Sequence, residues 1–147
     1  TTGRDSVMQI LQGLAKTLMK YQDPQSGTWY QVTDQGAREG NYLESSATAL
    51  FIYTLAKAVN KGYISKDYIE PTRKAFDGMV KTFTRLEEDG SYTITNCCAV
   101  AGLGGDSKRY RDGSFEYYIS EPVIENDPKS VGSFILAAIE YEKMTDK

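Results

Sequence analysis

Histidine is missing from this sequence of 147 residues, and its absence narrows the chemistry that the chain can perform. A Ser-His or Cys-His nucleophile pair is excluded, and so is a metal site built on histidine. Any acid–base chemistry within the chain must therefore use carboxylates, lysine or tyrosine.

Cysteine is nearly as scarce, because the only two, Cys97 and Cys98, are adjacent. A disulfide between neighbouring residues is geometrically awkward, and a single Cys-Cys pair does not make a metal site. We therefore expect two half-buried thiols and no bound metal.

Long apolar runs and an excess of one charge are also lacking. No run reaches the roughly 18 apolar residues that span a membrane, so no membrane-spanning helix is expected. The 17 basic residues nearly balance the 20 acidic ones, which argues against nucleic acid or an anionic membrane surface as a partner. The length predicts a single domain, residues 1–147, with a sizeable core.

Two segments have the pattern of amphipathic helices. From about residue 5 to residue 22, and again from about residue 66 to residue 87, apolar residues recur at helical spacing while the other face is polar. Asp5 or Ser6 can cap the first helix, and Pro71 falls in or near the first turn of the second, where it is tolerated. The two stripes are Val7, Ile10, Leu11, Leu14 and Leu18, and Ile69, Phe76, Met79, Val80 and Phe83.

Two further predicted helices, 44–60 and 128–143, are nearly free of charge over much of their length, which is typical of buried helices. Gly62 is a stop signal after the first of them. Short β-prone stretches, TWYQVT at 28–33 and SYTIT at 91–95, predict small ribbons in the preceding loops.

The order of these elements is an internal repeat. Each unit has an amphipathic helix, a turn with glycine, a short ribbon, a polar loop and an apolar helix. GTWYQV at Gly27 corresponds to GSYTIT at Gly90, and residues 41–45 correspond to 126–130. Outer amphipathic and inner buried helices, joined by long loops on one rim, predict an all-α (α/α) toroid or barrel rather than a four-helix bundle.

Four segments carry a resemblance to a known family: DPQSGTWYQVTD, EGNYLESSATALFIYTLAKAVNKGYI, AVAGLGG and YRDGSFEYYISEPVIENDPKSVGSFILAA. Together the chain resembles the C-terminal part of the unsaturated rhamnogalacturonyl hydrolases, family 105 of the glycoside hydrolases, which are related to the unsaturated glucuronyl hydrolases of family 88. The resemblance implies a six-hairpin (α/α)6 barrel, of which this chain supplies about two hairpins with short β ribbons in the loops.

The resemblance also implies a reaction. Family members hydrate the C4=C5 double bond of an unsaturated uronate at the end of a pectin disaccharide and so release the neighbouring sugar, with a carboxylic acid as catalyst and no cofactor. The family's catalytic aspartate, its histidine and its Trp-x-Arg-Gly-Asn motif belong to the N-terminal half and do not occur here. No catalytic residue is therefore assigned, and the chain alone is expected to be inactive.

Six residues are candidates for binding an oligosaccharide substrate, each with a plain structural alternative. Trp29 and Tyr30 suit stacking on a sugar ring or packing of the ribbon. Glu44 and Ser45, with Ser46, open one inner helix, where they either cap it or line a pocket. Lys129 and Ser130 open the other, where they hold the uronate carboxylate or face solvent.

The remaining polar residues of the last loop have a structural interpretation. Its carboxylates, with basic residues close by in sequence, predict ion pairs that order the loop rather than a catalytic pair. Gly102, Gly104 and Gly105 lack the context of a phosphate loop and predict a tight turn. The carboxylates are those of Asp112, Glu116, Glu121, Glu125 and Asp127, and the basic residues are Lys108, Arg109, Arg111 and Lys129.

The functional hypothesis is thus a piece of a carbohydrate-active hydrolase. The alternatives are a non-catalytic helical-repeat module that binds glycan or protein, and another (α/α) barrel carbohydrate enzyme such as an epimerase or a lyase. In a closed barrel, neighbouring hairpins would cover apolar residues of the inner helices, so this chain should pair with the N-terminal half of the barrel or self-associate. Those residues are Leu50, Phe51, Ile52, Phe134, Ile135 and Leu136.

Overall fold

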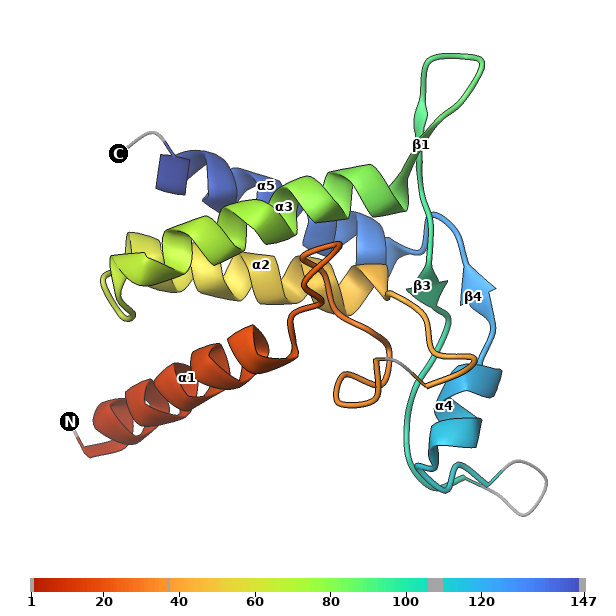
Figure 1. Ribbon diagram of the computed structural model, residues 1–147, viewed down its shortest axis with the longest axis horizontal. Coiled ribbons are helices and arrows are strands. Elements are labelled where there is room, and N and C mark those ends of the chain that lie inside the picture. Colours follow the sequence, from red (N-terminus) through yellow and green to blue (C-terminus); the bar gives the residue numbers. More distant parts are fainter. Residues whose placement is uncertain (1, 37, 106–109, 146–147) are drawn as a thin grey trace.

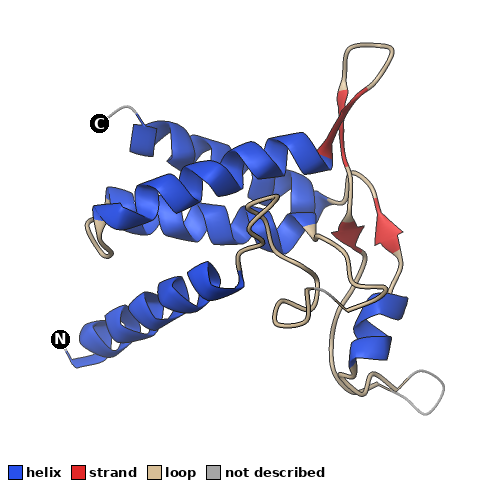
Figure 2. Cartoon of the chain, viewed as in Figure 1, coloured by secondary structure: helices blue, strands red, loops and turns tan. Residues whose placement is uncertain are grey.

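The computed structural model describes residues 2–36, 38–105 and 110–145. In these residues the long helices are α1 (Thr2–Tyr21), α2 (Ser45–Asn60), α3 (Ile69–Phe83) and α5 (Pro128–Thr145). Figures 1 and 2 show α1 and α3 running in one direction and α2 and α5 in the other, with the strands and the longer loops gathered at one end. The amphipathic helices α1 and α3 thus alternate along the chain with the apolar helices α2 and α5, as predicted.

The two inner helices α2 and α5 pack against each other in parallel. Near their first turns, Ser133 Oγ lies 3.5 Å from the Ser46 carbonyl oxygen. Further along, Asn60 Nδ2 donates to the Glu140 carbonyl oxygen at 2.9 Å. Helix α3 contacts both inner helices. No helix of the described residues is long and apolar enough to cross a membrane.

The core lies between α2, α3, α5 and the C-terminal half of α1. Trp29, from the loop after α1, is fully buried at its centre. Its indole Nε1 donates to the Leu18 carbonyl oxygen at 2.8 Å, and its ring meets Phe51 edge-on with centroids 5.3 Å apart. The other buried apolar members are Ala15, Leu18, Ala49, Ile52, Leu55, Ala75, Met79, Phe83 and Ala137.

Only part of the apolar stripe of α1 is buried. Ala15 and Leu18, toward its C-terminus, are buried in the core. Val7, Ile10 and Leu14 are 64%, 70% and 41% exposed. The apolar face of α1 is therefore wider than the surface on which the described residues pack.

One predicted ribbon and one predicted helix differ from the structure. The TWYQVT stretch forms no strand, since its backbone pairing is limited to a single bridge between Tyr30 and Leu43. The amphipathic helix predicted over 66–87 is shorter: residues Lys66–Tyr68 form a 3₁₀ turn, η1, and the α-helix α3 ends at Phe83. The chain then continues into β1 (Thr84–Leu86), which pairs antiparallel with β2 (Tyr92–Ile94) at the position of the predicted SYTIT ribbon.

Three short elements at the loop end were not predicted. Strand β3 (Cys97–Cys98) pairs antiparallel with β4 (Val123–Ile124), and α4 (Phe115–Ser120) lies in the loop that connects them. Ser114 caps α4, because its side chain accepts a hydrogen bond from Tyr117 N. These elements order the long second loop and bring β3 beside the inner helices.

The burial of Trp29 leads to a first prediction. Trp29→Ala removes an indole that is 0% exposed, so we expect a loss of about 3–5 kcal/mol in the free energy of unfolding, measured by urea denaturation. Tyr30→Ala is the matched control, because the Tyr30 ring is only partly covered and its removal should cost clearly less. Equal losses for the two variants would contradict the central place of Trp29 in the core.

Candidate functional site

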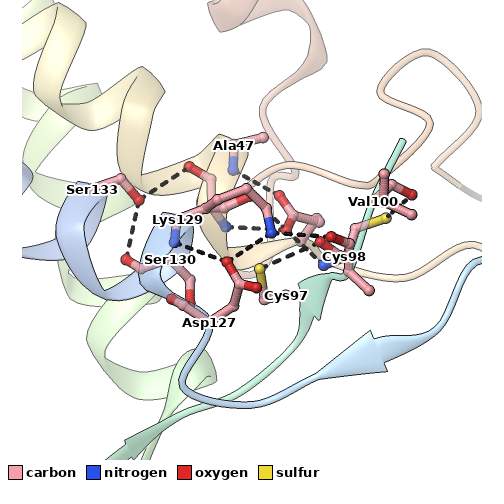
Figure 3. Close-up of polar contacts among 11 residues, drawn as sticks. Ala47, Cys97, Cys98, Val100, Asp127, Lys129, Ser130 and Ser133 are labelled. Atoms are coloured by element: carbon pink, nitrogen blue, oxygen red, sulfur yellow. Dashed lines mark hydrogen bonds and ion pairs between the residues drawn. The ribbon is translucent and has the colours of Figure 1, made fainter. Parts of the chain in front are cut away.

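The N-terminal ends of α2 and α5 lie side by side, and β3 runs past both of them. Figure 3 shows this cluster, in which Cys97 and Cys98 from β3 lie close to Ala47 from α2 and to Lys129 and Ser130 from α5. Ser45 and Ser130 are buried here, and Ser45 N donates to the Asn96 carbonyl oxygen at 3.0 Å. The structure therefore brings together four of the six predicted binding residues.

Glu44 is the most heavily bonded side chain of the cluster and is only 1% exposed. Its Oε1 accepts from Ser46 N at 3.2 Å, Ser46 Oγ at 2.8 Å and Cys98 N at 3.0 Å. Its Oε2 accepts from Ala47 N at 2.6 Å. Glu44 thus caps α2 and also holds β3, a strand that follows it by more than fifty residues. Capping was one of its two predicted roles.

The thiols of β3 are both buried. Cys98 Sγ accepts from Gln31 Nε2 at 3.2 Å, and its thiol faces the Val100 carbonyl oxygen at 3.4 Å. Burial, followed by the nearby Glu44 carboxylate, raises the pKa of the Cys97 thiol. Burial and the neighbouring Cys98 also raise the pKa of Tyr42. A thiol held in its protonated form is a poor nucleophile, so Cys97 has a structural place in the cluster.

Asp127 occupies the start of α5 in the way that Glu44 occupies the start of α2. Its Oδ1 accepts from Lys129 N at 2.8 Å and from Lys129 Nζ at 2.6 Å. The Lys129 ammonium also donates to the Ala99 carbonyl oxygen at 3.0 Å, and Ser130 Oγ donates to the Asp127 carbonyl oxygen at 2.9 Å. Each inner helix therefore has a carboxylate of its own at its N-terminus.

The ion pair between Asp127 and Lys129 shifts the pKa of both groups. Hydrogen bonds from the Lys129 side chain and then from its backbone lower the pKa of Asp127. The same side-chain hydrogen bond raises the pKa of Lys129. Among the described residues, two of the three Lys129 N–H donors have an acceptor, and the side chain is 53% exposed. One donor of Lys129 therefore remains available to a ligand.

The two predicted stacking residues lie apart from this cluster. Trp29 has no exposed ring face in this structure, because the core covers it completely. Tyr30 is partly exposed and packs against Gly36, whose added Cβ would lie 2.8 Å from the tyrosine ring. It lines a groove of about 310 Å³ with Lys20, Asp34 and other residues.

A larger groove of about 620 Å³ lies beside the cluster, between α1, the loop after Trp29, and the α4 region. Gln31 lines it and also contacts Cys98, so the groove and the cluster share a wall. Amide, hydroxyl and carboxylate groups next to apolar side chains are the mixture that suits a sugar. The β-prone pattern of the TWYQVTD stretch predicts a ribbon and does not indicate Gln31 and Asp34 as binding residues. The lining residues are Leu14, Thr17, Leu18, Tyr21, Gln31, Val32, Thr33, Asp34, Phe51, Ala101 and Tyr118.

Three carboxylates of the last loop form ion pairs within the described residues, two of them with partners that the local sequence did not suggest. Glu116 pairs with Arg38, whose guanidinium also lies over the Phe115 ring. Glu125 pairs with Arg85 of β1 at 2.7 Å. Asp112 accepts from Ser114 N at 2.9 Å, and Glu121 is buried. Lys108 and Arg109 lie outside the described residues.

Two glycines of this loop have a left-handed backbone conformation. Gly104 and Gly105 have φ angles of 76° and 125°, which favour glycine, and Gly104 is bridged to Arg111. Residues 2–36, 38–105 and 110–145 contain no group of three or more side chains suited to hold a metal ion.

A second prediction concerns Glu44. Glu44→Ala leaves the N–H donors of Ala47 and Cys98 without their acceptor, so we expect a loss of at least about 3 kcal/mol in unfolding free energy. Glu44→Gln keeps one acceptor oxygen but turns an NH₂ group toward one set of donors, so its loss should be intermediate. Urea denaturation gives these values, and faster exchange of the Cys98 amide hydrogen identifies the broken contact. An unchanged Cys98 amide in Glu44→Ala would show that Glu44 does not hold β3.

A third prediction follows from the lowered pKa of Asp127. A carboxylate with a lowered folded-state pKa stabilises the fold above the ordinary aspartate value of about 3.9, and this stabilisation is lost as pH falls through the lowered pKa. Asp127→Asn keeps a capping side chain and removes only the charge. Wild type should therefore be more stable than Asp127→Asn near neutral pH, and the difference should vanish in acid below the lowered pKa. A pH-independent difference would mean that the charge contributes nothing.

The comparisons with known proteins agree with the geometry. The model of Glycosyl Hydrolase Family 88 matches residues 1–145. Protein Atu3128 of Agrobacterium fabrum is 39% identical over 120 residues, which are 79% of this chain and 52% of that protein. The chain thus spans about half the length of the curated relatives that it matches.

Solved structures indicate the same family. A family 105 glycoside hydrolase from C. acetobutylicum superposes with a TM-score of 0.91 at 44% identity, covering 95% of this chain and 38% of that one. A possible family 105 member from Salmonella enterica superposes with a TM-score of 0.77 at 27% identity, covering 97% of this chain and 32% of that one. The chain therefore belongs to glycosyl hydrolase family 88, as a segment of the (α/α)6 barrel of the family 88 and family 105 hydrolases.

Proposed function

We propose that this segment forms one wall of the sugar-binding site of a hydrolase that hydrates the C4=C5 double bond of unsaturated uronates at the ends of rhamnogalacturonan disaccharides. The observation that carries the proposal is the match of nearly the whole chain to a family 105 glycoside hydrolase. The YRDGSFEYYISEPVIENDPK stretch, which favours the unsaturated rhamnogalacturonyl hydrolases over other (α/α) barrel enzymes, supports it further.

In the proposed reaction this segment binds and orients the sugar, and the acid comes from another part of the barrel. Protonation of the alkene and addition of water give an unstable product that opens and releases the neighbouring sugar. Glu44 and Asp127 are both engaged as helix caps with several hydrogen bonds each. A carboxylate committed in this way is a poor general acid, which fits a role in binding rather than catalysis.

The groups proposed to bind the sugar would have different roles. The free N–H of the Lys129 ammonium would donate to the uronate carboxylate, with Ser130 and Asp127 fixing the helix start behind it. Ser45 Oγ is buried and has no hydrogen-bond partner among the described residues. Gln31, Asp34 and Tyr118 in the adjoining groove would accept and donate to the hydroxyl groups of the neighbouring sugar.

The test joins residues 1–147 to the part of the C. acetobutylicum enzyme that this chain does not cover. Hydration is followed as loss of the ultraviolet absorbance of an unsaturated disaccharide. Lys129→Ala should raise KM on the order of tenfold to a hundredfold, because one hydrogen bond between charged groups is lost.

Lys143→Ala, which removes an exposed lysine at the far end of α5, is the matched control and should leave KM unchanged. An unchanged KM in Lys129→Ala would remove this residue from the site. Binding of the disaccharide without turnover in the joined protein would favour the non-catalytic glycan-binding module instead.

A further inference from the structure

The groove of about 620 Å³ beside the cluster takes its walls from two loops that are far apart in the sequence. Gln31 and Asp34 come from the loop between α1 and α2, residues 22–44, which we call the first loop, whereas Tyr118 comes from α4 of the second loop. Figure 1 shows the first loop reaching across to α4. The shape of the groove therefore depends on how α4 is held on the first loop.

Arg38 of the first loop joins the two walls. The central carbon of its guanidinium lies 3.8 Å from the centroid of the Phe115 ring, and its Nη2 forms an ion pair with Glu116. Its Nη1 donates to Gln35 Oε1 at 2.9 Å within the first loop. One planar group thus contacts a ring, a carboxylate and an amide together, and the ammonium of a lysine lacks the fork that this requires.

The face of α4 that meets the first loop lies next to Tyr118. Phe115, which is buried, and Ile119 are one helical turn apart and so share a face. Ile119 lies directly against Gly40 of the first loop, where an added Cβ would come within 2.8 Å of the Ile119 Cδ1. Tyr118 follows Phe115 by three residues and lies at the edge of the same face. A shift of α4 away from the first loop would therefore move Tyr118 as well.

The first loop is the firmer side of this contact. The Asn41 side chain closes it, because Nδ2 donates to the carbonyl oxygens of Val32 and Gln35 at 2.9 and 2.8 Å and Oδ1 accepts from Val32 N at 3.1 Å. Helix α4 has six residues, and a helix of that length is not stable without packing. Within its own loop it has a hydrogen bond from Gly102 N to Tyr117 Oη at 3.1 Å. Its place therefore depends strongly on its contacts with the first loop.

We infer that Arg38 is a positioning residue for sugar binding, because it docks α4 on the first loop and so holds Tyr118 in one groove with Gln31 and Asp34. In the proposed function, on which this rests, these three side chains bind the sugar next to the uronate. When α4 leaves its docked place the groove loses a wall, and the apparent dissociation constant rises in inverse proportion to the docked fraction. The chemical step belongs to another part of the barrel, so its rate stays the same.

The experiment compares Arg38→Ala with Arg73→Ala in the protein that joins residues 1–147 to the remaining part of the C. acetobutylicum enzyme. Arg73 is the matched control, because it also forms an ion pair, with Glu70 of α3, and the two arginine side chains are 45% and 42% exposed. It lies outside the lining of the groove. The substrates are the unsaturated disaccharide and the methyl glycoside of the same unsaturated uronate, which has no neighbouring sugar to enter the groove.

Arg38→Ala should raise KM for the disaccharide about threefold to thirtyfold with kcat unchanged, since an exposed cation–ring contact and an exposed ion pair are lost. KM for the methyl glycoside should not change, and Arg73→Ala should alter neither value. Arg38→Lys keeps the charge without the planar fork and should fall between wild type and Arg38→Ala. General damage to the fold would raise KM for both substrates. That result, or an unchanged KM for the disaccharide, would overturn the inference.

Lys129→Ala, measured alongside, separates this inference from the proposed function. Lys129 is proposed to hold the uronate, so its removal should raise KM for both substrates. If Lys129→Ala raises both values and Arg38→Ala raises neither, the positioning role of Arg38 is wrong and the proposed site stands. If Lys129→Ala leaves both values unchanged, the proposed uronate site is wrong.

Hydrogen exchange in the chain of residues 1–147 tests the docking of α4 without any substrate. The Tyr118 amide donates to the Ser114 carbonyl oxygen at 3.1 Å, so it exchanges when α4 opens. Arg38→Ala should accelerate this exchange by the same factor of about threefold to thirtyfold, because the same contacts are lost, and Arg73→Ala should not. An unchanged exchange rate in Arg38→Ala would show that Arg38 does not hold α4, which would overturn the inference whatever the kinetics.

Discussion

Burying the Glu44 carboxylate is the constraint on which the loop end of this structure depends. Removing a carboxylate from water costs several kcal/mol, and only well-placed donors offset that cost. Here three backbone N–H groups and one hydroxyl supply them, each bond to a charged acceptor contributing about 1.5–3 kcal/mol. Three of these four donors come from the first turn of α2 and one from Cys98 of β3. One side chain therefore fixes where α2 begins and where the second loop crosses it.

Because Glu44 and Asp127 fill the starts of both inner helices, neither helix N-terminus is open to an anionic ligand. The backbone N–H groups that make helix starts good anion sites already face a carboxylate of the chain itself. Recognition of a uronate at this end would then rest on side chains. Lys129 suits that task, since Asp127 and the Ala99 carbonyl hold its ammonium in place and leave a donor unused.

Periodicity in the sequence predicted the helices and their inner and outer roles, because the buried face of a helix appears in its own sequence as apolar residues at helical spacing. It did not predict features whose partners are distant in sequence. The TWYQVT stretch looked like a strand, yet Trp29 is drawn into the core and little backbone pairing is left. The amphipathic pattern ran past Phe83, whereas residues 84–86 pair with β2. The charges at Glu116 and Glu125 suggested ion pairs, but their partners, Arg38 and Arg85, lie about 80 and 40 residues away.

The candidate site and the exposed apolar residues of α1 and α5 lie on the same helices, and this couples them. Helix α5 presents Lys129 at its first turn and the exposed Ile135, Leu136 and Ile139 about two turns later, and it contacts α2 mainly through small residues. An element that packs on these three residues will restrain the tilt and position of the whole helix, including the ammonium at its start. Helix α1 is coupled in the same way, because Leu14 is both partly exposed and part of the groove beside Gln31. An element packed on either helix and a sugar at the loop end would therefore stabilise the same arrangement of helices, so each should strengthen the binding of the other.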